Sequence, residues 1–289
     1  MEKIKIAECF YSIQGEGRFM GVPSVFLRTF GCNFQCGGFG MPRGEKTTEP
    51  NDIAQVAHFY NKYEELPLVE TGCDSYASWH PAFKHLSPFY SPEEVVNKIV
   101  DLLPYKEWRD EHLIITGGEP LLKWQYIYPE ILGHARMQGL KEITFETNGT
   151  QPLTDEFKTW IHREWHHDGT INMGRGRDTF TFSVSAKLPC SGEAFEKAIR
   201  PEVVAEYEEY GYVYLKFVIA NDQDAEDAER AIELYRAAGL EGPVYFMPVG
   251  GTESVYHMNN RAVADLAMKR GYRYSDRLQV PLFKNEWGT

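Results

Sequence analysis

Residues 23–36 read Pro23-Ser24-Val25-Phe26-Leu27-Arg28-Thr29-Phe30-Gly31-Cys32-Asn33-Phe34-Gln35-Cys36. As far as Phe30 the run is almost wholly apolar, which is typical of a strand buried on both faces. Two cysteines follow it at once, and a third, Cys73, stands beyond a gap of 36 residues, 37–72. Three thiolates can hold three irons of a 4Fe–4S cluster and leave the fourth iron open for a sulfonium such as S-adenosylmethionine (SAM).

A zinc site is the alternative interpretation of the cysteines, with His80 or His85 as a fourth ligand. A Cys-x3-Cys pair is weak evidence by itself, because buried structural cysteine is common. The glycine motifs described below favour the cluster. Residues 37–72 are polar and follow no single period, so we expect an insertion between the second and third cysteines, with a short helix at about 52–60.

The composition indicates a single domain over residues 1–289, because 43% apolar and 14% aromatic residues suffice for a large core. A net charge of −12 disfavours nucleic-acid binding, which needs a surplus of Lys and Arg. We see no signal-peptide pattern and no apolar run near the ~18 residues that span a membrane. Irregular cysteine spacing favours a cytoplasmic protein, with Cys9 and Cys190 as incidental thiols.

Predicted strands alternate with predicted helices along most of the chain. We expect strands at 4–12, 23–30, 112–116, 142–147, 179–184, 212–220 and 243–248. We expect helices at 91–103, where Ser91-Pro92-Glu93-Glu94 makes a capping box, then at about 121–139, from 154, at 192–210, 222–239 and 259–270, and a tail, 276–289, with a short strand and a loop. This alternation predicts parallel strands and an α/β fold, specifically a partial (β/α)6-type barrel.

Unusual residues fall where the predicted strands end, which is the edge that carries the chemistry in barrel-like α/β folds. Gly117-Gly118-Glu119-Pro120 offers bare backbone and a carboxylate to an ammonium group. The alternative is a tight turn with an acid at a helix start. Glu146 either accepts ribose hydroxyls or pairs with Lys141 or Arg28.

Four more polar residues are candidates for ligand binding. Ser185 and Lys187 end a strand and offer groups for a ribose and a carboxylate. Asp74 and Ser75 follow the third cysteine and carry the hard oxygens that Mg²⁺ prefers. His166-His167-Asp168 has metal-binding side chains, but its polar surroundings predict a solvated loop.

Arg28 is the only charge in its strand and needs an anionic partner. That partner is Glu8, Glu16 or the carboxylate of a substrate, which guanidinium recognises well. Glu16 itself stands between Gly15 and Gly17, which either let the backbone approach a ligand or form an ordinary turn.

Together these motifs resemble the 7-carboxy-7-deazaguanine synthase family of radical-SAM enzymes. The resemblance is carried by residues 10–17, 21–28, 31–32, Cys36, 73–79, 116–122, 146–149, 184–187, 215–218 and 276–279. It spans most of the chain apart from about 37–72 and 155–178. The gap before Cys73 is longer than usual in the family, Ser-Ala-Lys stands in place of its Ser-Pro-Lys, and Ser75 replaces its Mg²⁺-binding threonine.

The resemblance implies a reaction, the conversion of 6-carboxy-5,6,7,8-tetrahydropterin to 7-carboxy-7-deazaguanine with loss of ammonia. It implies that a 4Fe–4S cluster reduces SAM to methionine and a 5′-deoxyadenosyl radical. This radical would remove a hydrogen from the pterin and return it after ring contraction, while Mg²⁺ binds the substrate carboxylate. The product would feed queuosine-type 7-deazapurine biosynthesis for tRNA or DNA.

The resemblance also implies a role for each matched residue. The cluster ligands would be Cys32, Cys36 and Cys73, and the Mg²⁺ ligand Ser75. SAM would be held by Asp74, Gly117, Gly118, Glu119, Glu146, Ser185 and Lys187. The pterin would be held by Ile13, Gln14, Gly15, Glu16, Arg28 and Thr116.

The implied partners are a second copy of the chain and an electron donor such as flavodoxin or ferredoxin. Two other functions stay open at this point. One is an activase that makes a glycyl radical on a partner protein, which requires an open face for a peptide. The other is a catalytically idle binding protein that uses 37–72 as its contact surface. Glu16 and Arg28 favour a small anionic heterocycle over a peptide, and the complete set of cysteines favours an enzyme.

Overall fold

A computed structural model describes residues 2–165 and 179–289. Within them, one nine-stranded sheet runs in the order β3-β1-β2-β4-β5-β6-β7-β8-β9. Its strands are β1 (Ile4–Ile13), β2 (Pro23–Thr29), β3 (Phe89–Tyr90), β4 (His112–Gly117), β5 (Ile143–Thr147), β6 (Phe180–Val184), β7 (Tyr212–Ile219), β8 (Val244–Pro248) and β9 (Arg273–Tyr274). Neighbours from β2 to β9 are parallel, while β1 and β3 are antiparallel at one edge. This confirms the predicted α/β class with a large parallel sheet.

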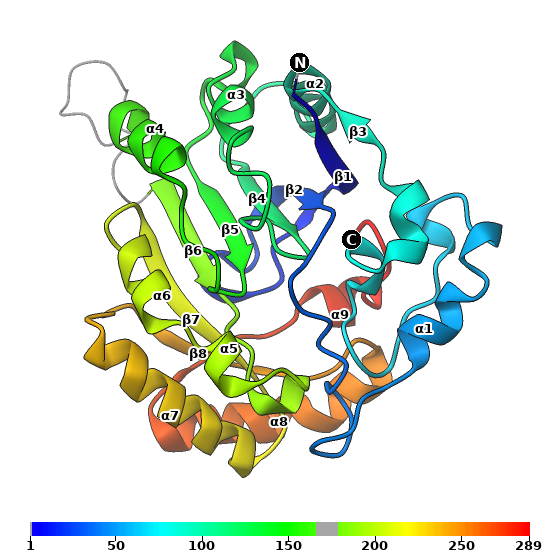
Figure 1. Ribbon diagram of the computed structural model, residues 1–289, viewed down its shortest axis with the longest axis vertical. Helices are drawn as coiled ribbons and strands as arrows, with labels where there is room; N and C mark the ends of the chain where they lie inside the picture. Colours follow the sequence, from blue (N-terminus) through cyan, green and yellow to red (C-terminus); the bar gives the residue numbers. More distant parts are fainter. Residues whose placement is uncertain (1, 166–178) are drawn as a thin grey trace.

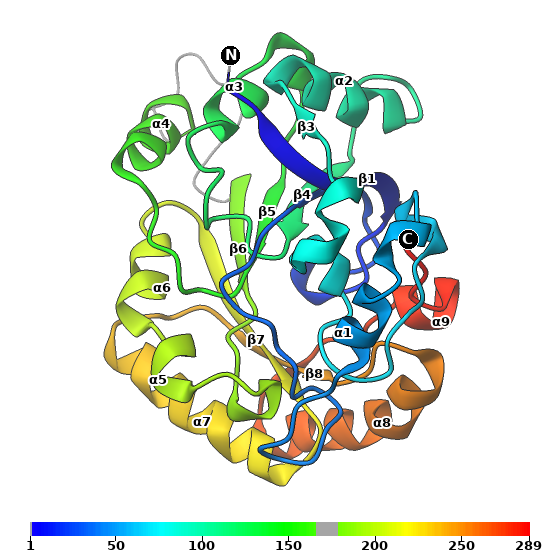
Figure 2. The same ribbon diagram turned by 45° about the vertical axis from the view of Figure 1, so that its right-hand side comes forward.

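The helices are α1 (Glu49–Ala54), α2 (Pro92–Leu102), α3 (Tyr128–Leu132), α4 (Asp155–Trp165), α5 (Phe195–Ala198), α6 (Pro201–Tyr207), α7 (Asp222–Ala237), α8 (Glu253–Arg270) and α9 (Gln279–Phe283). Figure 1 shows α3, α4, α6, α7 and α8 outside the sheet, whereas α1 lies on the side of the molecule that carries the C-terminus. Figure 2 shows the same pairing of α1 with the C-terminal end. None of the helices in the described residues is long and apolar enough to cross a membrane.

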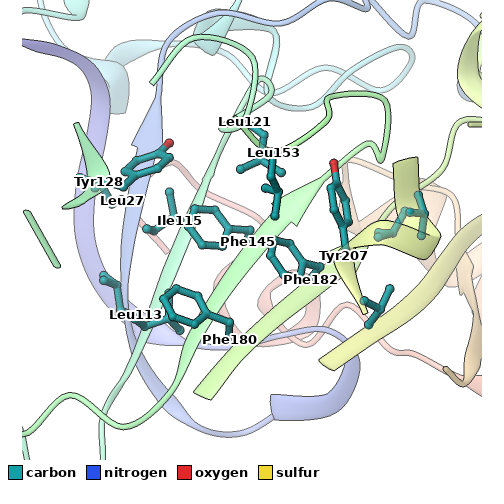
Figure 3. Close-up of a cluster of buried hydrophobic side chains, with 14 of the residues drawn as sticks. Leu27, Leu113, Ile115, Leu121, Tyr128, Phe145, Leu153, Phe180, Phe182 and Tyr207 are labelled. Atoms are coloured by element: carbon teal, nitrogen blue, oxygen red, sulfur yellow. The ribbon is translucent and has the colours of Figure 1, made fainter. Parts of the chain in front are cut away.

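The two faces of the sheet differ because side chains alternate along a strand. In β6, Phe180 and Phe182 enter the main apolar core, while Thr181 and Ser183 point to the opposite face. Phe145 of β5 stacks on the Phe182 ring at 5.7 Å between ring centres. Figure 3 shows these rings together in the core. The helix-covered face is therefore apolar, and the opposite face is free to carry polar groups.

The predicted capping box at the start of α2 is confirmed. Ser91 Oγ accepts the N–H of Glu94 at 3.3 Å, and the Glu94 carboxylate accepts the N–H of Ser91 at 2.7 Å. The two side chains satisfy two backbone donors that a helix start leaves without partners. They fix the point at which the chain turns back towards the sheet.

Two predicted helices are shorter in the structure. The helix expected at 121–139 is reduced to α3 and a 3-10 turn, because Pro129 sets its first turn and Gly133 ends it. The helical stretch expected at 192–210 is split into α5 and α6. Arg200, before Pro201, has non-helical backbone, as the proline ring favours for its predecessor.

Three further boundaries differ from the prediction. The helix in the insertion begins earlier, at Glu49, and α8 begins at Glu253 instead of 259. The short strand expected in the tail is β9, before 276, and the tail itself contains a helix, α9. The candidate metal group at 166–168 lies outside the described residues.

Residues 37–72 pack against the rest of the domain. Tyr63 and Leu66 are buried in a second apolar cluster with Tyr76 and Phe83, beyond the third cysteine. Trp287 from the C-terminal end packs against it, with its ring 5.6 Å from that of Tyr63. The stretch and the end of the chain therefore form one wall over the polar face of the sheet.

Candidate active site

A cavity of about 260 Å³ opens on the polar face, at the carboxyl ends of the parallel strands. With one exception, every predicted site residue lines it: Ile13, Gln14, Gly15, Glu16, Arg28, Cys32, Cys36, Cys73, Asp74, Ser75, Thr116, Gly117, Gly118, Glu146, Ser185 and Lys187. The exception is Glu119, which is fully buried behind the lining residues. The ends of β2, β4, β5 and β6 bring many of these residues together, whereas Ile13–Glu16 come from the end of β1, which is antiparallel and ends beside the start of β2.

The three cysteines gather at one end of the cavity. Cys32, Cys36 and Cys73 pack together with Phe34 and Phe39. Burial raises the pKa of Cys32 to about 12, and burial also raises the pKa of Cys36 and of Cys73. Binding to a cationic metal centre reverses this preference, because a coordinating thiol is deprotonated outright.

This donor set fits an iron–sulfur cluster. Among residues 2–165 and 179–289, no group of three or more His, Cys, Asp and Glu side chains is arranged to hold a single metal ion. A cluster needs no such grouping, because each thiolate binds an iron of its own. Three sulfurs that line one cavity are the side chains that a cluster with an open iron requires.

The two histidines of the zinc interpretation are engaged elsewhere. His80 contacts Asn51 Oδ1 at 3.2 Å and accepts the N–H of Ala82. The ring nitrogens of His85 lie 3.0 and 3.1 Å from the carbonyl oxygens of Ala82 and Tyr60. Neither imidazole lines the cavity with the thiols, so neither completes a four-ligand site there.

The two glycines at the end of β4, Gly117 and Gly118, allow a close approach of two loops. Gly117 has φ +139°, and a Cβ on it would lie 2.2 Å from the Thr29 carbonyl oxygen. A Cβ on Gly118 would lie 2.4 Å from the Gly31 carbonyl oxygen and 2.8 Å from Cys32 Cβ. Bare backbone is therefore required where the β4 loop meets the first cysteine.

Glu119 holds this loop from behind. Its carboxylate accepts the hydroxyl of Thr147 at 2.8 Å and the N–H groups of Asn148 at 2.7 Å and Leu121 at 3.0 Å. Burial raises the pKa of Glu119, and these donors counter only part of that effect. The tight turn weighed as the alternative is thus present, and Glu119 joins the ends of β4 and β5.

The end of β6 supplies a cation near the sulfurs. Ser185 N–H donates to the Thr147 carbonyl at 2.7 Å, which continues the β5–β6 ladder by one bond. Lys187 Nζ donates to Ser185 Oγ at 3.0 Å and lies 5.8 Å from the centre of the Phe39 ring. Its positive charge favours the charged form of each cysteine sulfur, although burial has the larger effect on their pKa values.

A second group of lining residues is built around Lys216, which is 2% exposed on β7. Its ammonium lies 2.6 Å from Glu16 and 2.9 Å from Glu146. Glu146 also accepts from Gln14 at 3.1 Å and from Ser183 at 2.9 Å. The pairing of Glu146 with Lys141 or Arg28, predicted as one alternative, is wrong, because Lys216, two strands away in the sheet, takes that place.

Glu16 is held from a second side by the C-terminal segment. Arg277 Nε lies 3.3 Å from its carboxylate, and Gln279 donates to it at 2.9 Å. Burial opposes ionisation, but Lys216 and Arg277 outweigh it and lower the pKa of Glu16 to about 2. Burial likewise opposes the charge on Lys216, and its two carboxylate partners raise the pKa of the ammonium. Glu16 and Lys216 are therefore both ionised at neutral pH.

Asp74 extends the network towards the third cysteine. Arg277 reaches its carboxylate at 2.5 Å; burial opposes the charge, but this ion pair outweighs it and lowers the pKa of Asp74. Ser75 Oγ accepts from Arg28 at 2.9 Å and lies 3.3 Å from Asp74 Oδ1. The hydroxyl and carboxylate predicted to favour Mg²⁺ are thus adjacent, and both line the cavity.

Arg28 forms an ion pair with Glu8, one of the partners predicted for it. Its Nε lies 2.8 Å from Glu8, a buried carboxylate on the neighbouring strand β1. Burial raises the pKa of Glu8, and Arg28 offsets part of that effect. With one edge paired to Glu8 and one directed at Ser75, the guanidinium still lines the cavity.

Sequence reasoning missed Lys216, Arg277 and Gln279 as site residues. Lys216 had a usable signal, because it is the only charge in the strand 212–219, the same argument that singled out Arg28. Arg277 and Gln279 had none beyond their place in a matched motif, since each meets Glu16 across more than 200 residues of sequence.

Known proteins resemble this chain along most of its length, although no family model matches the sequence. A 7-carboxy-7-deazaguanine synthase from Halobacterium salinarum is 30% identical, over 98% of this chain and 91% of its own length. One from Pyrobaculum aerophilum is 26% identical, over 99% and 97%. The crystal structure of QueE from Escherichia coli has the same fold, with a TM-score of 0.53 and 18% identity over 96% of this chain and 94% of that one.

Proposed function

The chain belongs to the 7-carboxy-7-deazaguanine synthase family, and we propose that it converts 6-carboxy-5,6,7,8-tetrahydropterin to 7-carboxy-7-deazaguanine with loss of ammonia. The observation that carries the proposal is the composition of one cavity. Three thiols and a buried network of acids and bases line the same cavity. A radical enzyme needs this adjacency, because a radical made at the metal end must reach the substrate without meeting solvent.

Cys32, Cys36 and Cys73 would hold a 4Fe–4S cluster. When bound, the cluster supplies the electron that cleaves SAM to methionine and a 5′-deoxyadenosyl radical. The chain's own contribution is a pocket of low polarity, formed by Phe34 and Phe39 around the sulfurs, with Lys187 as a nearby cation.

SAM would lie between the sulfurs and the ends of β4 to β6. The bare backbone of Gly117 and Gly118 can face its ammonium, and Ser185 and Lys187 can face its ribose and carboxylate. Asp74 and Glu146 line the same space. Glu119 would act by positioning, since it fixes the glycine loop from behind and does not line the cavity.

The pterin would occupy the polar end. Glu16 and Gln14 offer acceptors and donors to its fused ring, next to the backbone of Ile13 and Gly15 and the side chain of Thr116. Arg28 would face its carboxylate, and Ser75 would hold Mg²⁺ against the same group. The Lys216 and Arg277 pairs keep Glu16 ionised and fixed in place for this purpose.

The finer predictions on architecture and partners belong to the same proposal. The parallel sheet would be a partial (β/α)6-type barrel within a single domain, 1–289, with 37–72 as an insertion that closes one side of the cavity. The enzyme would act as a homodimer and receive electrons from a flavodoxin or ferredoxin.

The test is anaerobic reconstitution followed by turnover with SAM, Mg²⁺, a reductant and 6-carboxytetrahydropterin, with products identified by mass. We expect 5′-deoxyadenosine and a deazaguanine product formed with loss of ammonia. SAM cleavage without that product would overturn the substrate assignment and favour an activase acting on a protein. Absence of both iron and SAM cleavage would favour the idle binding protein.

A further inference from the structure

The backbone at the second cysteine forms a small anion-binding site. Cys36 has φ +52°, a left-handed conformation that is uncommon for a residue with a side chain. Successive N–H groups around such a residue point in nearly the same direction and form a concave nest for an anion. Nests of this kind bind phosphates and iron–sulfur centres in other proteins.

In this chain the nest is filled by a carboxylate from another loop. Glu193 Oε1 accepts the N–H of Gln35 at 3.0 Å and the N–H of Cys36 at 2.9 Å. Glu193 lies beyond β6, 157 residues from Cys36, and does not line the cavity. Its contact is therefore with the back of the cysteine loop and not with a ligand.

The two loops are docked by more than this side chain. Gly38 N–H donates to the Ser191 carbonyl at 2.9 Å. A Cβ on Gly38 would lie 2.5 Å from the backbone nitrogen of Gly192, so the backbones are in direct contact. Three backbone N–H groups of the cysteine loop thus donate to residues 191–193, and Glu193 accepts two of these hydrogen bonds.

We propose that Glu193 is a positioning residue for the cluster: it fixes the turn at Cys36 and holds a negative charge against the cluster loop. The proposal rests on the proposed function, because it assumes that the cysteines hold a cluster. The potential of an iron–sulfur cluster depends on nearby charge and on hydrogen bonds to its sulfurs. Glu193 acts on both, since it adds a negative charge and engages two amide donors that would otherwise be free to turn to the sulfurs. Both effects make the cluster harder to reduce and its electron more strongly reducing.

Two substitutions separate charge from anchoring. Glu193→Gln keeps an oxygen that can accept both N–H groups and removes only the charge. Glu193→Ala removes the acceptor as well. Glu196→Gln is the matched control, because Glu196 is an exposed acid three positions further on.

The first measurement is a redox titration of the anaerobically reconstituted proteins, followed by electron paramagnetic resonance. In E193Q we expect the midpoint to become less negative, so that the ratio of reduced to oxidised cluster at a fixed potential rises severalfold; tenfold equals about 59 mV for one electron. In E196Q we expect the wild-type midpoint. The second measurement is hydrogen exchange of the peptide that contains residues 33–38, together with iron content. In E193A we expect faster exchange and less iron per chain.

Either of two results overturns the proposal. One is an E193Q midpoint that does not differ from that of E196Q. The other is an E193A loop that exchanges as slowly as the wild type and keeps all its iron. A wild-type protein that takes up no iron overturns the proposed function instead, and the exchange measurement on that preparation then decides alone whether Glu193 fixes the loop.

Discussion

Replacement of Lys216 by methionine should destabilise the protein strongly, and more at neutral than at acidic pH. Lys216 is 2% exposed, and its ammonium lies close to two carboxylates, those of Glu16 (2.6 Å) and Glu146 (2.9 Å). Methionine has nearly the same length and apolar character as the lysine stem, so it removes the charge without leaving a large void. Two largely buried carboxylates would then lose their shared cation.

The magnitude follows from the ion pairs. Breaking a buried pair by removing one partner costs about 3–5 kcal/mol, because the other charge stays buried. The pKa of Glu16 gives a similar figure, since a fall from 4.5 to about 2 corresponds to roughly 3 kcal/mol at about 1.36 kcal/mol per pKa unit. Arg277 supplies part of that effect on Glu16, but Lys216 also serves Glu146. We therefore expect a loss of about 3–5 kcal/mol at pH 7.

The pH dependence has a defined sign. In the wild type the pKa of Glu16 is lowered, so its contribution to stability is complete above about 4.5 and is lost only as the pH falls towards 2. In the variant Glu16 loses the strongest of the effects that lower its pKa, so we expect its carboxylate to take up a proton at a higher pH than in the wild type, between about pH 7 and 5. The difference in unfolding free energy between the two proteins should therefore shrink over that range.

The assay is urea unfolding followed by circular dichroism at pH 7 and pH 5. Lys269→Met is the control, because Lys269 is exposed on α8 and its loss should change stability by less than about 0.5 kcal/mol. A loss below about 1 kcal/mol for K216M at pH 7, or a loss of the same size at both pH values, would contradict the conclusion that a buried ionised network organises this end of the cavity.

Three other substitutions test other parts of the site. Cys73→Ala should abolish iron binding and turnover while the circular dichroism spectrum stays that of the wild type; retained activity would contradict its role. Gly38→Ala should reduce iron per chain, because its Cβ would meet the Gly192 backbone at 2.5 Å, whereas Gly37→Ala, with 3.5 Å to its nearest neighbour, should not. Equal iron contents would show that the loops are not tightly docked. Trp287→Ala should lower the unfolding free energy by about 1–3 kcal/mol, less than for a fully buried tryptophan, because Trp287 packs against the second apolar cluster. It should also raise the KM for the pterin, because Trp287 lines the cavity and its loss weakens the contact that holds the C-terminal segment there. An unchanged KM would separate that wall from substrate binding.

Local sequence patterns predicted the elements whose cause is itself local. The capping box at Ser91, the apolar strand after Pro23 and the glycine turn after β4 each depend on residues within a few positions of one another. The ends of parallel strands meet at one edge, and this rule alone placed the residues after β2, β4, β5 and β6 together, but not Ile13–Glu16 or Cys73–Ser75.

The same patterns gave wrong or incomplete predictions where a contact joins residues far apart in the sequence. They also failed where a helix is interrupted although its apolar residues keep a helical period. The helix expected at 121–139 was wrong in length because Pro129 and Gly133 interrupt it, which the apolar pattern does not reveal. Arg277 stands in a matched motif, but nothing local marks it as a site residue, and only the fold brings it to Glu16 and Asp74. Glu193 was passed over for the same reason, since the nest it fills exists only once Cys36 adopts its left-handed turn.

The cluster itself is tested most directly by the spectrum of the reduced protein with and without SAM. After anaerobic reconstitution we predict about four irons per chain. We also predict an electron paramagnetic resonance signal that changes when SAM is added, because SAM would bind the iron that no cysteine holds. Zinc in place of iron, or a cluster whose signal SAM leaves unchanged, would contradict the assignment of Cys32, Cys36 and Cys73 to a cluster with one open iron.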